Sequence, residues 1–317
     1  MVKQSVAVDL NGLRFPHPVL AASGCLGMGR DVPSLVDLHR LGGVVTRSLT
    51  FAPSKGAPTP RAAETASGVV TAIGLQNPGV EGFLGEDLPR LTKSQVPVIA
   101  SVAGATLEEY IQVAGALHRE PGVVALEVYL SGPDDERDGQ PFYARPERIN
   151  EVVGAICRLS VIPVFVKLPP LVPDLVETAQ QCVRLGAHGL TLIDSVPGLA
   201  VDAERLRAKL AAPVGGLSGP AIKPIALAAV YQVARAMPEV PIMGVGGIAN
   251  GSDAVEFLLA GAWALQVGTA LLVDPGAPVE IARGIVAYLK AKGIGSPEDL
   301  RGRLRVRGED VREVAGS

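Results

Sequence analysis

Two short segments late in the chain have the composition of a phosphate-binding site. Gly246 and Gly247 close one apolar run, and Gly268 and Thr269 close the next. Glycine lets the backbone approach a ligand closely, and free N–H groups between a strand and a helix bind anions. In barrel proteins, the loops after strands seven and eight frequently hold a phosphate. These four residues are therefore candidate phosphate ligands; the alternative is that the glycines only form tight turns.

Lys167 closes another apolar run, Val164-Phe165-Val166. A lysine at the end of a buried strand points into the open end of a sheet or barrel. There its ammonium could stabilise an anion such as a reduced flavin, or pair with a carboxylate. An ordinary structural ion pair is the alternative reading of the same position.

Strands must carry these residues, and the sequence contains eight short apolar runs that are typical of buried parallel strands. They are Val19–Ser23, Gly43–Thr46, Val96–Val102, Val123–Val128, Val161–Lys167, Gly189–Ile193, Val240–Val245 and Ala264–Val267. Segments with helical periodicity lie between them: Leu107–His118, Pro146–Leu159, Asp174–Leu185, Ile222–Ala236 and Ser252–Leu259. Eight strand–helix units predict an α/β fold, a (β/α)8 TIM barrel. A doubly wound open sheet is the alternative.

Composition limits the class of protein. The 317 residues carry 29 Lys+Arg against 32 Asp+Glu, so a nucleic-acid-binding protein is not expected. Three cysteines are too few for a disulfide framework and suit a reducing cytoplasm. No apolar stretch predicts a membrane span or a signal peptide. We expect one cytoplasmic domain over residues 1–317, with a charged C-terminal extension from about residue 294.

Several motifs together resemble the dihydroorotate dehydrogenase family, from Val8 to about Tyr288. They are Pro60-Arg61, Ala72-Ile73-Gly74-Leu75-Gln76-Asn77-Pro78-Gly79, Val166-Lys167-Leu168, Gly215-Gly216-Leu217-Ser218-Gly219, Gly244-Val245-Gly246-Gly247-Ile248 and Gln266-Val267-Gly268-Thr269. The chain is most similar to the class 1 enzymes, in particular the type that works with an electron-transfer partner subunit. The resemblance implies that FMN is the cofactor and that the protein is a homodimer. No metal site or iron–sulfur motif is expected in this chain.

The resemblance also implies which residues surround the cofactor. The positions that map onto flavin contacts are Ala22, Ser23, Arg47, Lys167, Ile193, Gly219, Gly246, Gly247, Gly268 and Thr269. Those that map onto substrate contacts are Arg47, Thr71, Asn77, Tyr129, Asp134, Asp194 and Ser195. Cys25 follows the first strand near the flavin, and an inert buried thiol is its expected role.

The substrate side departs from the family pattern. The family segment Asn-(Ile/Val/Leu)-Ser-Cys-Pro-Asn supplies the cysteine base, and this chain reads Tyr129-Leu130-Ser131-Gly132-Pro133-Asp134. Gly132 cannot transfer a proton. The family lysine after the second strand is Arg47, and the family asparagine after the sixth strand is Asp194.

These departures change the charge offered to a substrate. An asparagine offers a donor and an acceptor, whereas an ionised aspartate offers acceptors only and repels an anion such as orotate. Tyr129, Asp134 and Asp194 are candidates for a replacement acid/base, and the alternative is that the proton chemistry is lost or different. Ser131 is expected to point away, because side chains alternate along an extended segment.

The sequence therefore predicts an FMN-dependent oxidoreductase that acts on a CH–CH bond of a small molecule other than dihydroorotate. Two alternatives remain. One is an atypical dihydroorotate dehydrogenase of pyrimidine biosynthesis, and the other is a non-catalytic flavin-binding subunit.

Overall fold

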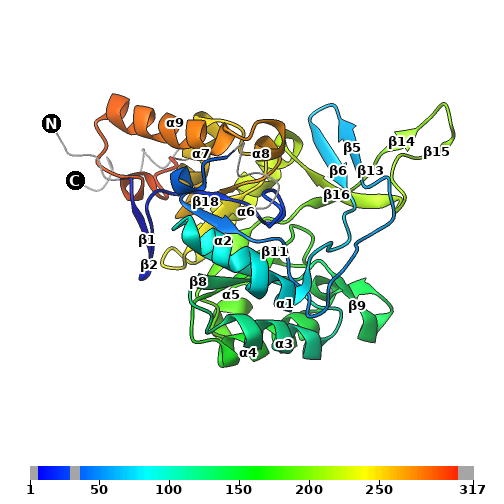
Figure 1. Ribbon diagram of the computed structural model, residues 1–317. Helices are drawn as coiled ribbons and strands as arrows, with labels where there is room; N and C mark the ends of the chain where they lie inside the picture. Colours follow the sequence, from blue (N-terminus) through cyan, green and yellow to red (C-terminus); the bar gives the residue numbers. More distant parts are fainter. Residues whose placement is uncertain (1–5, 29–35, 306–317) are drawn as a thin grey trace.

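The core of the protein is a closed barrel of parallel strands (Figure 1). The computed structural model describes residues 6–28 and 36–305. The barrel strands are β3 (Val19–Ala21), β4 (Gly43–Val45), β7 (Val98–Val102), β8 (Val123–Tyr129), β11 (Val164–Leu168), β12 (Gly189–Leu192), β17 (Ile242–Val245) and β18 (Ala264–Val267). They neighbour one another in chain order, and β18 pairs with β3 to close the ring. The predicted (β/α)8 barrel is confirmed, and the open-sheet alternative is wrong because the sheet has no edge.

Helices surround the barrel. The main ones are α3 (Leu107–Leu117), α4 (Pro146–Leu159), α5 (Leu175–Arg184), α6 (Lys223–Ala236), α7 (Gly251–Ala260) and α9 (Ala277–Lys292). Shorter ones are α1 (Gly79–Gly82), the π-helix η2 (Phe83–Asp87), α2 (Leu88–Lys93) and α8 (Thr269–Val273), with one-turn 3-10 segments at Leu38–Arg40, Asp135–Arg137, Phe142–Ala144, Pro220–Ile222 and Glu298–Leu300. Thr106 and Asp174 accept hydrogen bonds from the backbone at the starts of α3 and α5, which fixes where those helices begin.

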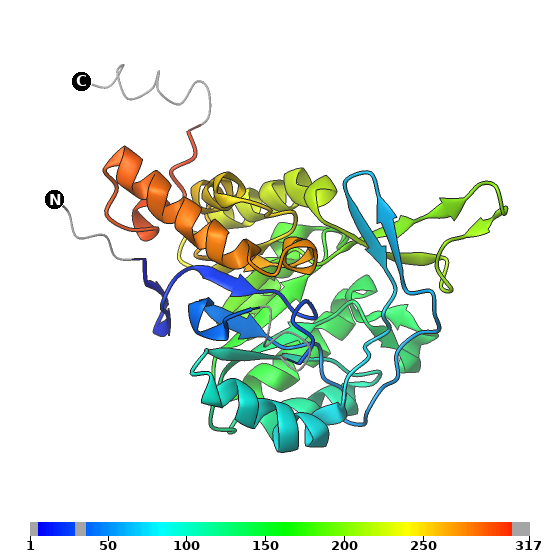
Figure 2. The ribbon, with the colours of Figure 1, turned by 45° about the horizontal axis from the view of Figure 1, so that its top comes forward.

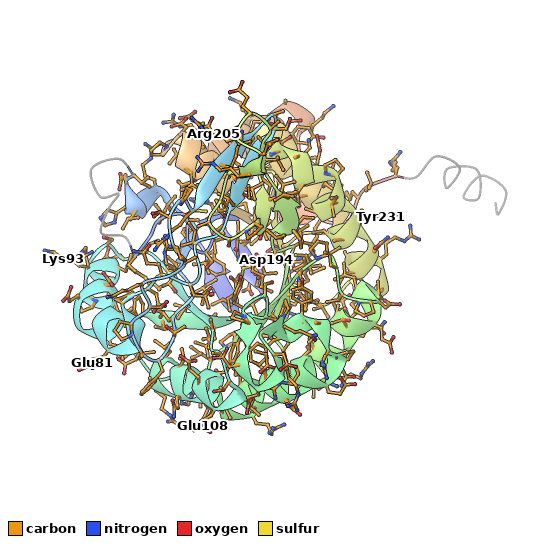
Figure 3. All side chains as sticks on the ribbon, turned by 90° about the vertical axis from the view of Figure 1, so that its right-hand side faces the viewer. Glu81, Lys93, Glu108, Asp194, Arg205 and Tyr231 are labelled. Atoms are coloured by element: carbon orange, nitrogen blue, oxygen red, sulfur yellow. The ribbon has the colours of Figure 1, made fainter. Side chains whose placement is uncertain are left out.

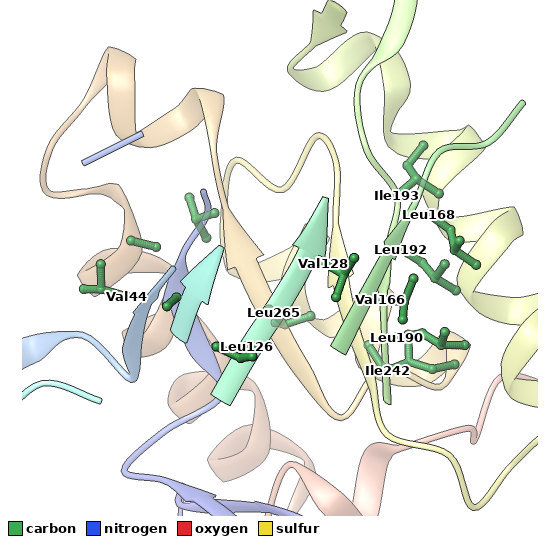
Figure 4. Packing of buried hydrophobic residues seen from close by; sticks show 14 of the residues in the cluster. Val44, Leu126, Val128, Val166, Leu168, Leu190, Leu192, Ile193, Ile242 and Leu265 are labelled. Atoms are coloured by element: carbon green, nitrogen blue, oxygen red, sulfur yellow. The ribbon is translucent and has the colours of Figure 1, made fainter. Parts of the chain in front are cut away.

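Branched aliphatic side chains fill the space between the strands and the helices. Val166, Leu168, Leu190 and Leu192 project from neighbouring strands toward the helices (Figure 4), and each is fully buried. Because both faces of these strands are buried, their sequences are continuous apolar runs rather than alternating ones.

One end of the barrel carries extra strands. The antiparallel sheet β13 (Val196–Leu199), β16 (Val214–Ser218), β6 (Gly68–Thr71) and β5 (Ala62–Thr65) is built from the segments that follow β4 and β12. The hairpin β14 (Val201–Asp202) and β15 (Arg207–Ala208) projects beside it (Figure 2). The pair β9 (Pro133–Asp134) and β10 (Gln140–Pro141) follows β8, whereas β1 (Val8–Leu10) and β2 (Leu13–Phe15) lie at the opposite end of the barrel (Figure 1).

The described part of the C-terminal extension packs back onto the barrel. Leu300 is buried, and the Arg301 guanidinium stands 3.4 Å from the centre of the Trp263 ring. The Gly302 N–H donates to the Leu258 carbonyl at the end of α7. Residues 306–317 of this extension lie outside the described residues. Within residues 6–28 and 36–305, no helix is long and apolar enough to cross a membrane.

Candidate active site

A cavity of about 1040 Å³ opens between the carboxyl ends of the barrel strands and the extra sheet. Residues after β3 and β4, Tyr129 and Ser131 at the end of β8, and Lys167 within β11 form its floor, and residues of β6 and β16 form its roof. This is the end at which TIM-barrel enzymes carry their active sites. Its volume is at the upper end of the range of small-molecule pockets, so it can hold a cofactor and a substrate together.

The structure brings all the predicted cofactor residues to the wall of this one cavity. These are Ala22, Ser23, Arg47, Lys167, Ile193, Gly219, Gly246, Gly247, Gly268 and Thr269. Lys167 lies on β11, Gly219 directly follows β16, and the others follow the five barrel strands β3, β4, β12, β17 and β18, so only the closed barrel brings them together.

Free backbone N–H groups gather at one side of the cavity. Within the described chain, the N–H groups of Gly246, Gly247, Gly268 and Thr269 donate no hydrogen bond to another residue. The N–H groups at the start of α7 are not free to bind a phosphate, because side chains already accept them. These acceptors are Asn250, the N-cap residue of α7, and Asp253. The N–H groups in the two loops, rather than the end of α7, thus form the candidate phosphate site.

A buried ion pair lies at the cavity floor. Asp194, near the middle of the ring of helices in Figure 3, has its Oδ1 3.6 Å from Nζ of Lys167. Burial alone would lower the pKa of Lys167, but the Asp194 and Glu127 carboxylates outweigh it and raise that pKa. The ammonium therefore stays charged. Lys167 is thus ion-paired and also lines the cavity, so the pair does not rule out the predicted contact with an anion there.

Tyr129, the last residue of β8, also lines the cavity. It pairs in register with Lys167 on β11, and its own carbonyl accepts a hydrogen bond from Tyr110. Burial raises the pKa of the Tyr129 phenol well above its ordinary value, and the Asp194 carboxylate raises it further. The phenol therefore keeps its proton near neutral pH.

Ser131 lines the cavity as well, contrary to the expectation that it points away. Its Oγ is buried and has no hydrogen-bond partner in the described residues. The alternation argument fails because β8 ends at Tyr129, so the backbone at Ser131 is no longer a strand. Nothing in the sequence distinguishes this serine from a structural one.

Gly132 is buried, and its position has room for a side chain. A Cβ placed there would lie 3.6 Å from Leu75 Cδ1 and 3.7 Å from Tyr129 Cε1, which are ordinary contacts. Both neighbours line the cavity. Burial raises the pKa of the Cys25 thiol to about 11, which makes it a poor base near neutral pH. This agrees with the inert role expected for Cys25.

Comparison with known proteins bears on this site. A sequence model of the dihydroorotate dehydrogenase family matches residues 5–289. The chain belongs to the dihydroorotate dehydrogenase family. It is 45% identical over 306 residues to the dihydroorotate dehydrogenase B (NAD(+)) catalytic subunit of Geotalea daltonii, covering 96% of this chain and 100% of that protein. The corresponding subunits of Geobacter sulfurreducens and Geobacillus sp. are 43% and 42% identical, each over 96% of this chain and 100% and 97% of theirs.

Membership of the dihydroorotate dehydrogenase family confirms the predicted resemblance, and with it that the chain is an oxidoreductase. Of the positions predicted to contact substrate, the structure places Arg47, Thr71, Tyr129, Asp194 and Ser195 on the cavity wall. It places the other two, Asp134 and Asn77, elsewhere.

Asp134, predicted to be a catalytic or substrate-binding residue, lies away from the cavity wall. Its carboxylate is 1% exposed and does not line the cavity, because Arg148 holds it from α4. Arg148 Nε lies 2.6 Å from Oδ2, and Arg148 Nη2 lies 3.0 Å from Oδ1. Arg148 also binds Glu136 and Glu151, so this cluster fixes the loop after β8.

Asn77, predicted to contact substrate, also lies away from the cavity wall. Its Oδ1 accepts the N–H groups of Thr50 and Gly79, and its Nδ2 donates to Thr50 Oγ1 and the Leu75 carbonyl. The polar atoms of this side chain therefore make their hydrogen bonds within the loops around Asn77. Leu75 of the same segment lines the cavity.

The ion pair between Asp134 and Arg148 leads to a stability prediction. The Asp134→Ala protein should lose about 3 kcal/mol of unfolding free energy, because truncating one partner of a buried pair leaves the other poorly compensated. Urea denaturation measures this loss. The matched change Glu136→Ala removes a carboxylate from the same arginine at a half-exposed position and should cost less than about 1 kcal/mol. Equal losses in the two variants would contradict the buried role of Asp134.

Proposed function

We propose that this chain is an FMN-dependent oxidoreductase of the dihydroorotate dehydrogenase family that acts on a CH–CH bond of a substrate other than dihydroorotate. One observation carries the proposal. The Asp194 carboxylate faces the cavity beside Lys167, while the position of the family base is the side-chain-less Gly132.

The residues present fit FMN. The unpaired N–H groups of Gly246, Gly247, Gly268 and Thr269 suit its phosphate, and the Lys167 ammonium suits the negative charge of a reduced flavin ring. When bound, FMN supplies hydride transfer to and from carbon. The remaining requirement of the reaction is a group that handles the accompanying proton.

Tyr129 is the group that we assign to the proton. Its phenol lies on the cavity wall beside the space that a side chain at Gly132 would enter. Because burial keeps this phenol protonated, it is suited to donate a proton from Oη to a carbon of an alkene. It is a poor base for removing a proton from a saturated carbon. The site therefore favours reduction of a C=C bond.

Asp194 defines the class of substrate. An ionised carboxylate in a cavity accepts hydrogen bonds and repels anions, so it favours a neutral amide or a cationic group. The carboxylate of orotate or dihydroorotate would meet this charge at short range. A site whose buried polar groups are unmatched discriminates strongly, by about 10⁴.

Reoxidation of the reduced protein tests the proposed function. Protein loaded with FMN is reduced without oxygen and mixed with neutral cyclic amides that contain a C=C bond, with cationic alkenes, or with orotate. We expect reoxidation by a neutral or cationic compound and none by orotate. Faster reoxidation by orotate than by every other compound would overturn the proposal, and no reoxidation by any would indicate the non-catalytic flavin-binding role.

Dihydroorotate oxidation is the second candidate function. The 45% identity to a dihydroorotate dehydrogenase B catalytic subunit over 96% of this chain favours it, and so does the presence of Ser195, which keeps the family residue type, on the cavity wall. Those relatives are named catalytic subunits, and from this we infer a partner subunit that accepts electrons from this chain. The family resemblance and the free cysteines lead us to propose, in addition, a homodimer and a cytoplasmic location. Co-purification of a flavin- and iron–sulfur-containing chain would support the partner.

Gly247→Ala tests where the phosphate binds. Gly247 has φ +77°, and a Cβ there would lie 2.9 Å from the Gly219 carbonyl oxygen, so the loop must move. We expect FMN affinity to fall about 100-fold, measured by fluorescence quenching on titration. The control Gly115→Ala on α3, whose Cβ would contact only Leu159 at 3.8 Å, should leave the affinity unchanged. Unchanged affinity in Gly247→Ala would place the phosphate elsewhere.

A further inference from the structure

Glu127 is a fully buried carboxylate inside the barrel, on β8 and below the cavity floor. Its Oε2 accepts hydrogen bonds from Thr191 Oγ1 at 2.9 Å and from Gln266 Nε2 at 2.7 Å. Its Oε1 has no hydrogen-bond partner among the described residues. A buried carboxylate with half of its acceptors unmatched is costly unless a cation lies near.

Lys167 is a cation on the strand that pairs with the strand of Glu127. On one side, Lys167 of β11 is paired in register with Thr191 of β12. On the other side it is paired with Tyr129 of β8, which is two residues beyond Glu127. Its nearest ion-pair contact is Asp194 at 3.6 Å, longer than a hydrogen bond, so its N–H groups are not all used in that pair. Glu127 lies beyond ion-pair distance of this ammonium, but its carboxylate still raises the pKa of Lys167 electrostatically.

We propose that Glu127 is a positioning residue that acts as the second counter-ion of Lys167. It keeps the ammonium charged and at the cavity floor when a substrate takes up the Asp194 carboxylate. The pairing itself does not depend on which substrate the enzyme uses. The alternative is that Glu127 only completes a polar layer with Thr191 and Gln266.

Thermal unfolding of four proteins without cofactor tests the pairing. The Tm is measured for the wild type, Glu127→Gln, Lys167→Met and the double variant. Glutamine keeps the shape and the acceptor for Thr191 but removes the charge. We expect Glu127→Gln to lower the Tm of the wild type and to raise that of Lys167→Met, because the methionine variant leaves two carboxylates without their cation.

The outcome that would overturn the proposal is a Glu127→Gln effect of the same sign and size in both backgrounds, as a purely structural polar layer predicts. Glu151→Gln, a half-exposed carboxylate paired with Arg148, is the matched control and should not raise the Tm of Lys167→Met. Because no cofactor is present, failure here is separate from failure of the proposed function.

A double-mutant cycle on FMN binding tests the same proposal without the Lys167→Met protein, which is useful if that variant does not fold. Either Asp194→Asn or Glu127→Gln leaves Lys167 one counter-ion, so each alone should weaken FMN binding less than about threefold. The double variant leaves none and should weaken it at least 30-fold. Single effects that simply multiply in the double variant would contradict shared pairing with Lys167.

Discussion

Tyr129→Phe should lower the turnover of the reduced, FMN-loaded protein by a factor of about 10² to 10⁴, the usual contribution of a positioned proton donor. FMN binding should change little, because the ring is kept and only Oη is lost. Stopped-flow reoxidation with the best substrate measures the loss. The pH dependence of the reoxidation rate is a second check. The Tyr129 phenol loses its proton only as the pH rises through its raised pKa, so this rate should stay constant up to pH 10.

Tyr143→Phe is the matched control for this prediction. The pKa of Tyr143 is also raised, by burial and by Asp194, but the residue does not line the cavity. Its loss should alter turnover less than threefold. A Tyr129→Phe protein that retains turnover within threefold of the wild type would remove Tyr129 as the donor and point to the unpaired Ser131 hydroxyl instead.

Asp194→Asn combined with Gly132→Cys should create dihydroorotate oxidation at least 100-fold above that of the wild type. The first change removes a charge that repels the substrate carboxylate and supplies a donor; at an effective dielectric of about 20, a unit charge 4 Å away is worth about 4 kcal/mol before pairing with Lys167 is considered. The second places a thiol at a position where an added Cβ makes only ordinary contacts, two of them with the cavity-lining residues Leu75 and Tyr129. Steady-state oxidation with an artificial acceptor measures the gain.

The single variants separate the two effects. Asp194→Asn alone should bind orotate at least tenfold more tightly while turning over slowly, and Gly132→Cys alone should gain little because the charge remains. Weaker orotate binding by Asp194→Asn than by the wild type would show that the carboxylate does not exclude the anion.

The fold was predictable because each barrel strand is buried on both faces. Runs such as Gly189–Ile193 and Ala264–Val267 match β12 and β18 closely. The fifth run was placed too early, at Val161 rather than Val164, because the residues before Pro163 are apolar but only partly buried or exposed and lie outside the strand. Helix α9 was not predicted, although it is the longest described helix and covers β3.

All the residues predicted to contact the cofactor line the cavity, whereas only some of those predicted to contact substrate do. Glycines and a lysine at strand ends are constrained by local chain geometry, which the sequence shows directly. The orientation of the Asp134 side chain depends on Arg148, which is 14 residues away on α4. The orientation of the Asn77 side chain depends on the backbone of Thr50. Such partners are set by tertiary packing, so no local pattern distinguishes a ligand-facing aspartate from one held in an ion pair.

Titration of the oxidised, FMN-loaded protein with orotate tests the central claim most directly, because ligands beside a flavin ring perturb its visible absorbance. If Asp194 and Gly132 have removed dihydroorotate chemistry from this site, orotate up to millimolar concentration leaves the spectrum unchanged and dihydroorotate bleaches it no faster than buffer does. A saturable spectral change at micromolar orotate, together with rapid bleaching by dihydroorotate, would contradict the account.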